Sequence, residues 1–157
     1  IFFSDRNYFF CLRLAQKYLE KYAIRISAYC LMPNHYHFLL TQKPGGSISR
    51  FLQTTFNAYT QAINKSLSHS GTLFQGKAKS KHVDSDSAIL QLVRYIHLNP
   101  VEACLVKSPK DWKYSDFTAW IKPSNSFLTD LSLRETYFRD GHEYESFVQE
   151  YQRDRSL

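Results

Sequence analysis

The chain has 157 residues, the length of one domain with a hydrophobic core of its own. Lysine and arginine outnumber aspartate and glutamate by 20 to 14, which favours an anionic partner such as nucleic acid. No apolar run approaches the roughly 20 residues of a membrane-spanning helix, no signal-peptide pattern opens the chain, and Cys11, Cys30 and Cys104 lack C-x-x-C spacing. We therefore expect an intracellular protein of the cytoplasm with reduced thiols.

The first predicted elements are a helix and a β-hairpin. Apolar residues recur at helical spacing over residues 5–22, and the stretch 24–30 then alternates like a strand. Residues 32–34 supply a turn containing proline and asparagine, and residues 35–42 form the second strand of the hairpin.

Two histidines stand at the start of this second strand, separated by Tyr36. Side chains alternate between the faces of a strand, so His35 and His37 are expected to point to the same side and Tyr36 to the other, apolar side. Two imidazoles on one face can bind a metal ion. They can equally be paired polar groups at the end of a strand, since histidine serves as a general-purpose polar residue.

The middle of the chain predicts a long helix followed by extended structure. An apolar stripe over 48–67 has helical spacing and is typical of a buried helix face. Residues 73–75 and 78–84 are expected to be extended, so that alternate lysines share one strand face. Such lysines often form a solvated surface, but here we favour contacts with phosphates, because polyanion affinity grows with their number. The lysines are Lys77, Lys79 and Lys81.

Another helix is predicted from residue 86, ending at Asn99 because the following proline disfavours helical backbone in the residue before it. Tyr95 lies on the flank of its apolar stripe, and Asn99, four residues later, lies close to the same line. Taken alone, Tyr95 reads as an aromatic side chain that packs its ring and exposes its hydroxyl. Further helices are expected around 131–139 and 142–154.

Three motifs in this order resemble those of the REP-associated tyrosine transposases, a branch of the single-tyrosine HUH transposases of small bacterial insertion sequences. Residues 29–40 read YCLMPNHYHFLL, residues 71–77 read GTLFQGK, and residues 92–101 read LVRYIHLNPV. The resemblance implies an α+β fold of ferredoxin-like or RRM-like type, an antiparallel sheet with helices packed mostly to one side. It also implies a transposase domain over 1–122, which lacks a strand that usually precedes residue 1, and a polar helical tail of the same domain over 123–157.

The resemblance also implies the chemistry of the site. Tyr95 corresponds to the nucleophile, and His35 and His37 correspond to ligands of a divalent metal, expected to be Mg²⁺ or Mn²⁺. Asn99 stands where related insertion-sequence transposases use glutamine as the third ligand, so a water-bridged contact, or substitution by Glu102 or His97, stays open. A phenol is a weak nucleophile at neutral pH, and a cation bound at the phosphate would assist its attack.

These implications describe a metal-dependent endonuclease and strand transferase that cleaves single-stranded, hairpin-forming repeat DNA through a covalent 5′-phosphotyrosine. The alternatives are a non-catalytic nucleic-acid-binding module of the same fold and a metallonuclease that uses water. Arg94 joins the lysines as an expected DNA contact, and a monomer is favoured over a dimer. Glu102 and Cys104 stand where many relatives have arginine and glycine, a difference expected to affect DNA affinity or the local turn.

Overall fold

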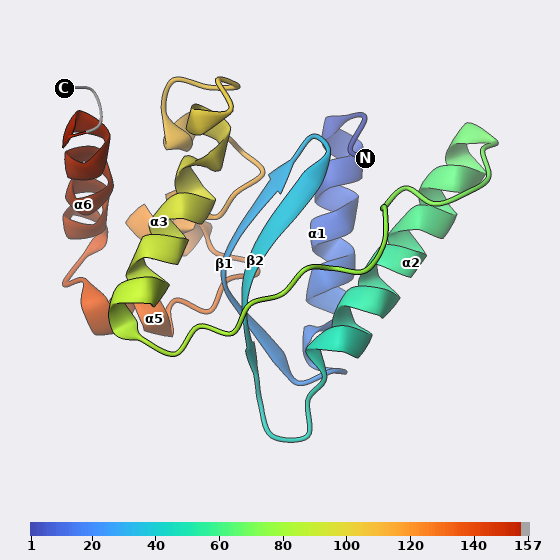
Figure 1. Cartoon of the computed structure of the whole chain (residues 1–157), viewed down its shortest axis with the longest axis horizontal. Coiled ribbons are helices and arrows are strands. Elements are labelled where there is room, and N and C mark those ends of the chain that lie inside the picture. The colour runs from blue at the N-terminus through green and yellow to red at the C-terminus, as the bar shows by residue number, and fades with distance from the viewer. Residues whose placement is uncertain (155–157) are drawn as a thin grey trace.

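The structure of the protein, a computed structural model, describes residues 1–154 except for the side chain of Asn125. A β-hairpin lies at the centre, with two long helices on one side and the remaining helices on the other (Figure 1). The elements are α1 (Asp5–Leu19), β1 (Ile24–Met32), β2 (His35–Gln42), α2 (Ile48–Leu67), α3 (Asp86–Glu102), η1 (Pro109–Asp111), α4 (Phe117–Ile121), η2 (Pro123–Asn125), α5 (Ser132–Tyr137) and α6 (Gly141–Asp154). The predicted α+β class with an antiparallel sheet is confirmed. Within the described residues no helix is long and apolar enough to cross a membrane.

The central strand β1 is buried on both faces. It pairs with β2 in antiparallel register, and the register shifts between Ile26 and Ala28, where Ser27 forms a bulge. One face of β1 packs with α1 and α2 through Ile24, Ile26, Tyr29 and Leu31. The other face packs with α3, α4 and α6 through Ala28, Cys30 and Met32. The helices therefore cover both faces of the sheet, where the sequence predicted a mostly one-sided arrangement.

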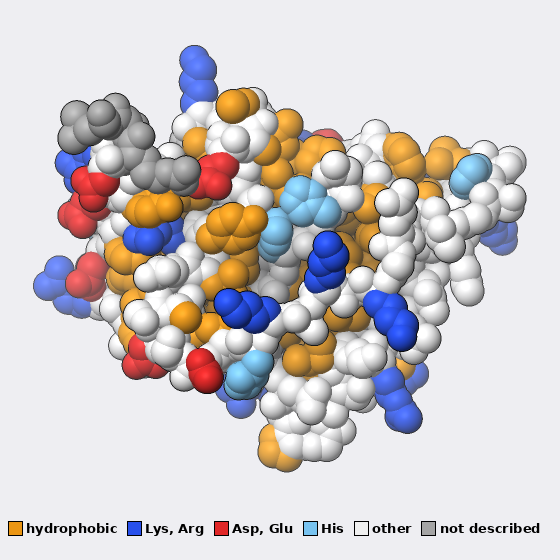
Figure 2. Space-filling model, viewed as in Figure 1, with side chains coloured by type: hydrophobic (Ala, Val, Ile, Leu, Met, Phe, Trp, Pro, Cys, Tyr) orange, Lys and Arg blue, Asp and Glu red, His pale blue; other side chains and the backbone are white. Residues whose placement is uncertain are grey.

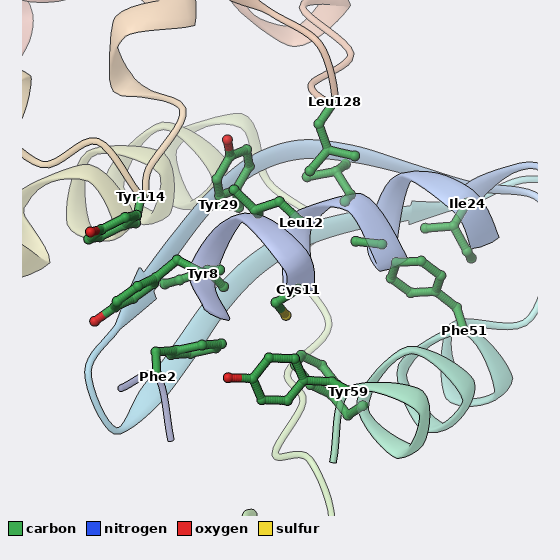
Figure 3. Packing of buried hydrophobic residues seen from close by; sticks show 14 of the residues in the cluster. Phe2, Tyr8, Cys11, Leu12, Ile24, Tyr29, Phe51, Tyr59, Tyr114 and Leu128 are labelled. Atoms are coloured by element: carbon green, nitrogen blue, oxygen red, sulfur yellow. The ribbon is translucent and has the colours of Figure 1, made fainter. Parts of the chain in front are cut away.

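The core between β1, α1 and α2 is rich in aromatic rings. Tyr8 stacks on Phe2 and on Tyr114, with ring centroids 4.7 Å and 3.6 Å away, and Figure 3 shows these rings lying in layers beside α1. The predicted helix 48–67 is confirmed, and its stripe buries Phe51 and Tyr59 in this core. The first helix ends at Leu19, before the predicted residue 22, because the chain turns into β1 at Ala23, which has a φ of 50°.

The linker between α2 and α3 contains no strand, so the strand face predicted for its lysines does not form, although 73–75 and 78–84 were expected to be extended. Leu73 and Phe74 pack against the aromatic core, but the residues from 75 to 82 are all exposed. Alternation of lysine with alanine and serine offers no apolar face to bury, and burial of one face is what holds a strand in its register.

Helix α3 continues through Pro100 to Glu102, so the predicted end at Asn99 is also wrong. Proline at 100 removes one backbone donor, but the last turn is closed by other bonds. The backbone N–H groups of Ala103 and Leu105 donate to the carbonyls of Asn99 and Pro100, each at 2.9 Å. Cys104, between them, adopts a left-handed φ of 56°. The N–H of Cys104 itself donates to the carbonyl of Val101 at 2.9 Å, and this bond and that of Leu105 form the usual helix-ending motif in which glycine is preferred at the left-handed position.

We predict that Cys104→Gly stabilises the protein by about 1 kcal/mol, because a side chain with a β-carbon is strained at this φ and glycine is not. The measurement is the free energy of unfolding in urea under reducing conditions. Ala103→Gly is the matched control, since Ala103 has a φ of −81° and glycine offers no relief there. An unchanged or lower stability for Cys104→Gly would contradict the strain.

The C-terminal part packs against the α3 side of the sheet as a short helix α4 and the helices α5 and α6. The last two match the predicted helices at 131–139 and 142–154 in position, although α5 is shorter. Trp120 of α4 donates from Nε1 to the carbonyl of the bulged Ser27 at 3.1 Å. The expected tail of 123–157 extends beyond the described residues at 155–157.

Candidate active site

The two histidines of β2 lie on the same face of the sheet, as the alternation predicts. In the hairpin His35 is paired with Met32 and His37 with Cys30, and both partners belong to the core shared with α3. The imidazole centroids are 4.9 Å apart. Tyr36 points to the other face. The sheet thus holds two imidazoles side by side facing α3.

Helix α3 brings Tyr95 to these histidines. Val93 and Ile96 are buried against β1, and Tyr95, on the flank of that stripe, keeps 47% of its surface exposed. Its ring centroid lies 5.5 Å from that of His37 in an edge-on arrangement. Figure 2 shows histidine side chains reaching the surface in the middle of this face, with hydrophobic and basic side chains around them. An exposed phenol beside two histidines is open to a large substrate.

Asn99 is the third polar group at this point. Its Nδ2 donates to the backbone carbonyl of Tyr95, one turn earlier, at 3.0 Å. Its side chain also lies near His37, where it slightly offsets the lowering of that imidazole's pKa by burial. Because Nδ2 is engaged by the helix backbone, the amide oxygen is the atom left to bind a ligand.

Both imidazoles are held in the neutral form. Burial lowers the pKa of His35, and burial followed by the charge of His35 lowers the pKa of His37. Nδ1 of His35 lies 2.7 Å from the side-chain oxygen of Asn34, which can only accept, so Nδ1 carries the proton and Nε2 presents its lone pair. Nε2 of His37 is buried with no hydrogen-bond partner among the described residues. Such a buried polar atom without a partner is rare, and it fits a site that binds a metal ion.

These observations fit a divalent metal ion bound by two imidazole nitrogens and one amide oxygen. Within residues 1–154 no group of three or more His, Cys, Asp or Glu residues could hold a metal. Glu102 and His97 therefore do not complete the site with the two histidines. His97 is fully buried in a separate network with Asp116 and Tyr144, whereas Asn99 lies one turn after Tyr95 on α3.

The predicted DNA contacts differ in their surroundings. The three lysines of the linker are exposed, although on irregular backbone and not on the shared strand face that was predicted. In Figure 1 the linker runs across the face of the hairpin between α2 and α3, and Figure 2 shows basic side chains on this part of the surface. Arg94 instead lies over two aromatic rings of α6. Its guanidinium carbon is 4.7 Å from the ring centroid of Phe147 and 3.8 Å from that of Tyr151.

Sequence reasoning missed the partners of His97. The imidazole contacts Asp116 and Tyr144, which are 19 and 47 residues away along the chain. The flanking Ile96 and Leu98 do indicate that this part of α3 is buried, but no local pattern identifies residues so distant. These partners could be found only from the folded chain.

Comparison with known proteins gives one match. The family model described as "Transposase IS200 like" matches residues 2–99. No curated protein and no solved structure matches the chain. The matched segment contains His35, His37, Tyr95 and Asn99, and it ends before Asp116 and Tyr144.

Proposed function

The chain belongs to the IS200-like transposase family, and on this premise we propose that it cleaves and rejoins single-stranded DNA with Tyr95 as its nucleophile. The family is one of transposases, enzymes that cut DNA. The observation that carries the proposal is the 5.5 Å between the rings of Tyr95 and His37, which brings an exposed phenol to a pair of neutral imidazoles.

In the proposed reaction the phenolic oxygen of Tyr95 attacks a backbone phosphorus. The bond from phosphorus to the 3′ oxygen breaks, the phenol loses its proton, and the leaving 3′ oxygen gains one. The products are a 5′-phosphotyrosine and a free 3′ hydroxyl. One phosphodiester replaces another, so the step needs no energy source, and a 3′ hydroxyl can reverse it by attacking the phosphotyrosine.

His35, His37 and the amide oxygen of Asn99 would hold the metal ion, Mg²⁺ or Mn²⁺. Once bound, it would supply positive charge to a non-bridging oxygen of the scissile phosphate. The chain itself contributes the neutral imidazoles, the fixed orientation of His35 through Asn34, and the placement of Tyr95 by α3.

The substrate we propose is a DNA hairpin with an unpaired flank, of the repetitive extragenic palindrome type, as in the REP-associated branch that the motifs resemble. A folded stem offers shape, and an unpaired backbone can bend toward an exposed tyrosine. The rings of Tyr95 and His37 lie 5.5 Å apart within one chain, which supports action as a monomer.

The test is incubation of the protein with end-labelled single-stranded hairpin DNA and Mn²⁺, followed by a denaturing gel. A protein-linked band is expected, together with a fragment that ends in a 3′ hydroxyl. Cleavage without the linked band would favour a metallonuclease that uses water. Binding without cleavage would favour a non-catalytic nucleic-acid-binding module.

The basic linker yields a separate prediction. If the three linker lysines bind phosphates, replacing all of them with glutamine is expected to weaken binding to every DNA sequence alike. The slope of log affinity against log salt concentration is expected to become shallower by about 0.7 per lost phosphate contact. Sequence preference is expected to survive, because phosphate contacts carry no base information. Binding is measured across a salt series, with Lys17→Gln, an exposed lysine of α1, as the control. An unchanged slope for the triple variant would show that the lysines are merely solvated.

A further inference from the structure

A buried hydrogen-bond network joins the inner face of α3 to the part of the chain that follows the family match. Nε2 of His97 lies 2.8 Å from Oδ1 of Asp116, and Nδ1 lies 2.5 Å from the hydroxyl of Tyr144. All three residues are at most 2% exposed. The carboxylate of Asp116 can only accept, so Nε2 carries a proton, and in the neutral imidazole Nδ1 accepts from the tyrosine hydroxyl.

Asp116 connects this network to the central strand. Its Oδ1 also accepts from the backbone N–H of Tyr29 at 2.7 Å, and its own N–H donates to the carbonyl of Tyr29 at 3.2 Å. Its Oδ2 accepts from the hydroxyl of Thr129 at 2.8 Å. Tyr29 is paired in the hairpin with Phe38, the residue after His37. One carboxylate therefore links α3 to the same hairpin that carries the histidines.

The position of His97 on α3 makes this link important for Tyr95. Two residues along a helix correspond to a rotation of about 200°, so His97 points inward while Tyr95 points to the surface. The apolar contacts of Val93 and Ile96 are non-directional, so they fix the rotation and register of the helix less sharply than hydrogen bonds do. Hydrogen bonds weaken steeply when their angles change, so two bonds at His97 restrict both movements.

Helix α6 contacts α3 at a second point on the same side. Arg94, three residues before His97, lies over the rings of Phe147 and Tyr151, while Tyr144 of the same helix bonds His97. Residues three apart are neighbours on a helix surface. Helix α6 thus holds α3 through a buried polar contact and a partly exposed cation–π contact.

We propose that His97, Asp116 and Tyr144 are positioning residues that set the place of Tyr95 relative to His37. The segment from Asp116 to α6, which lies beyond the family match, then has the role of orienting the tyrosine helix. This inference rests on the proposed function for its effect on cleavage, although the placement of Tyr95 can be measured without cleavage.

The main test is Tyr144→Phe, which removes one hydroxyl and leaves the ring in place. Tyr59→Phe is the matched control, because Tyr59 is also fully buried and its hydroxyl donates to the carbonyl of Ile1 at 3.0 Å in the other core. The rate of adduct formation at saturating DNA is expected to fall about tenfold in Tyr144→Phe alone, since small misplacements of a reacting group are costly. DNA affinity is expected to stay unchanged in both variants. The rate of adduct formation in Tyr59→Phe, corrected for the folded fraction, is also expected to stay unchanged.

A second readout needs neither DNA nor metal. 3-Fluorotyrosine placed at position 95 reports its surroundings through its ¹⁹F resonance, which is sensitive to the nearby ring of His37. The resonance is expected to shift or broaden in Tyr144→Phe and in Asp116→Asn, and to match the unmutated protein in Tyr59→Phe. Circular dichroism identifies any variant that fails to fold. Tyr144→Phe, the milder change, decides the test if Asp116→Asn does not fold.

The outcomes separate the two hypotheses. A moved resonance with a slower adduct rate supports the positioning role. An unmoved resonance and an unchanged rate in a folded Tyr144→Phe protein would overturn it. If the unmutated protein forms no adduct, the proposed function fails, and the ¹⁹F comparison alone still decides whether the network places Tyr95.

Discussion

Replacing Tyr95 with phenylalanine is expected to abolish the covalent protein–DNA adduct, lowering its rate of formation by about 1,000-fold or more. The variant lacks the single oxygen that attacks phosphorus, and the remaining groups cannot form a phosphotyrosine. Stability is expected to change by no more than about 0.5 kcal/mol, because the side chain is half exposed. The measurement is a denaturing gel of the protein with labelled hairpin DNA and Mn²⁺, with DNA affinity measured in parallel.

Tyr36→Phe is the control for this experiment. Tyr36 lies between the two histidines in sequence but on the other face of the sheet, where its ring stacks on Phe56 at 4.1 Å and burial raises its pKa to about 12. Tyr29 and Tyr59 are more deeply buried, and burial raises their pKa further. A protein-linked band that persists in Tyr95→Phe would show that another residue is the nucleophile and would refute the assignment of Tyr95.

His35→Ala and His37→Ala are each expected to remove cleavage and to lower Mn²⁺ affinity by more than about tenfold. Each change leaves one imidazole and one amide, too few protein ligands to hold a weakly bound divalent ion. Calorimetric titration with Mn²⁺ measures the affinity without DNA. His142→Ala is the control, because His142 is exposed on α6 away from these ligands. Wild-type Mn²⁺ affinity in both site variants would refute the metal site.

The same titration has an expected pH dependence. Burial places the pKa of both site histidines below their usual value of 6.5, so protons compete with the metal only at lower pH. Affinity is therefore expected to fall as the pH drops through the lowered pKa values, with the midpoint of the fall below pH 6.5. A decline that is already complete above pH 6.5 would contradict the burial of these rings.

The sequence by itself determined the parts of this protein that depend on local periodicity. Alternation along β2 predicted that His35 and His37 share a face, and the 3.6-residue period predicted the helix at 48–67 and the flank position of Tyr95. Together with the motifs, these patterns predicted the candidate site residues. Local periodicity did not predict the backbone of the linker lysines correctly. Lysine recurs at every second residue there, but no apolar face accompanies it to stabilise a strand.

Only the tertiary structure decided how the site is held together. The bulge at Ser27 and the burial of β1 on both faces place α3 beside the histidines, and neither can be read from the strand alone. Helix α3 passes through Pro100 because its last turn finds other bonds. Asp116 and Tyr144 reach His97 from distant parts of the chain. Local patterns report which way a side chain points within its own element, whereas its partners depend on how the whole chain packs.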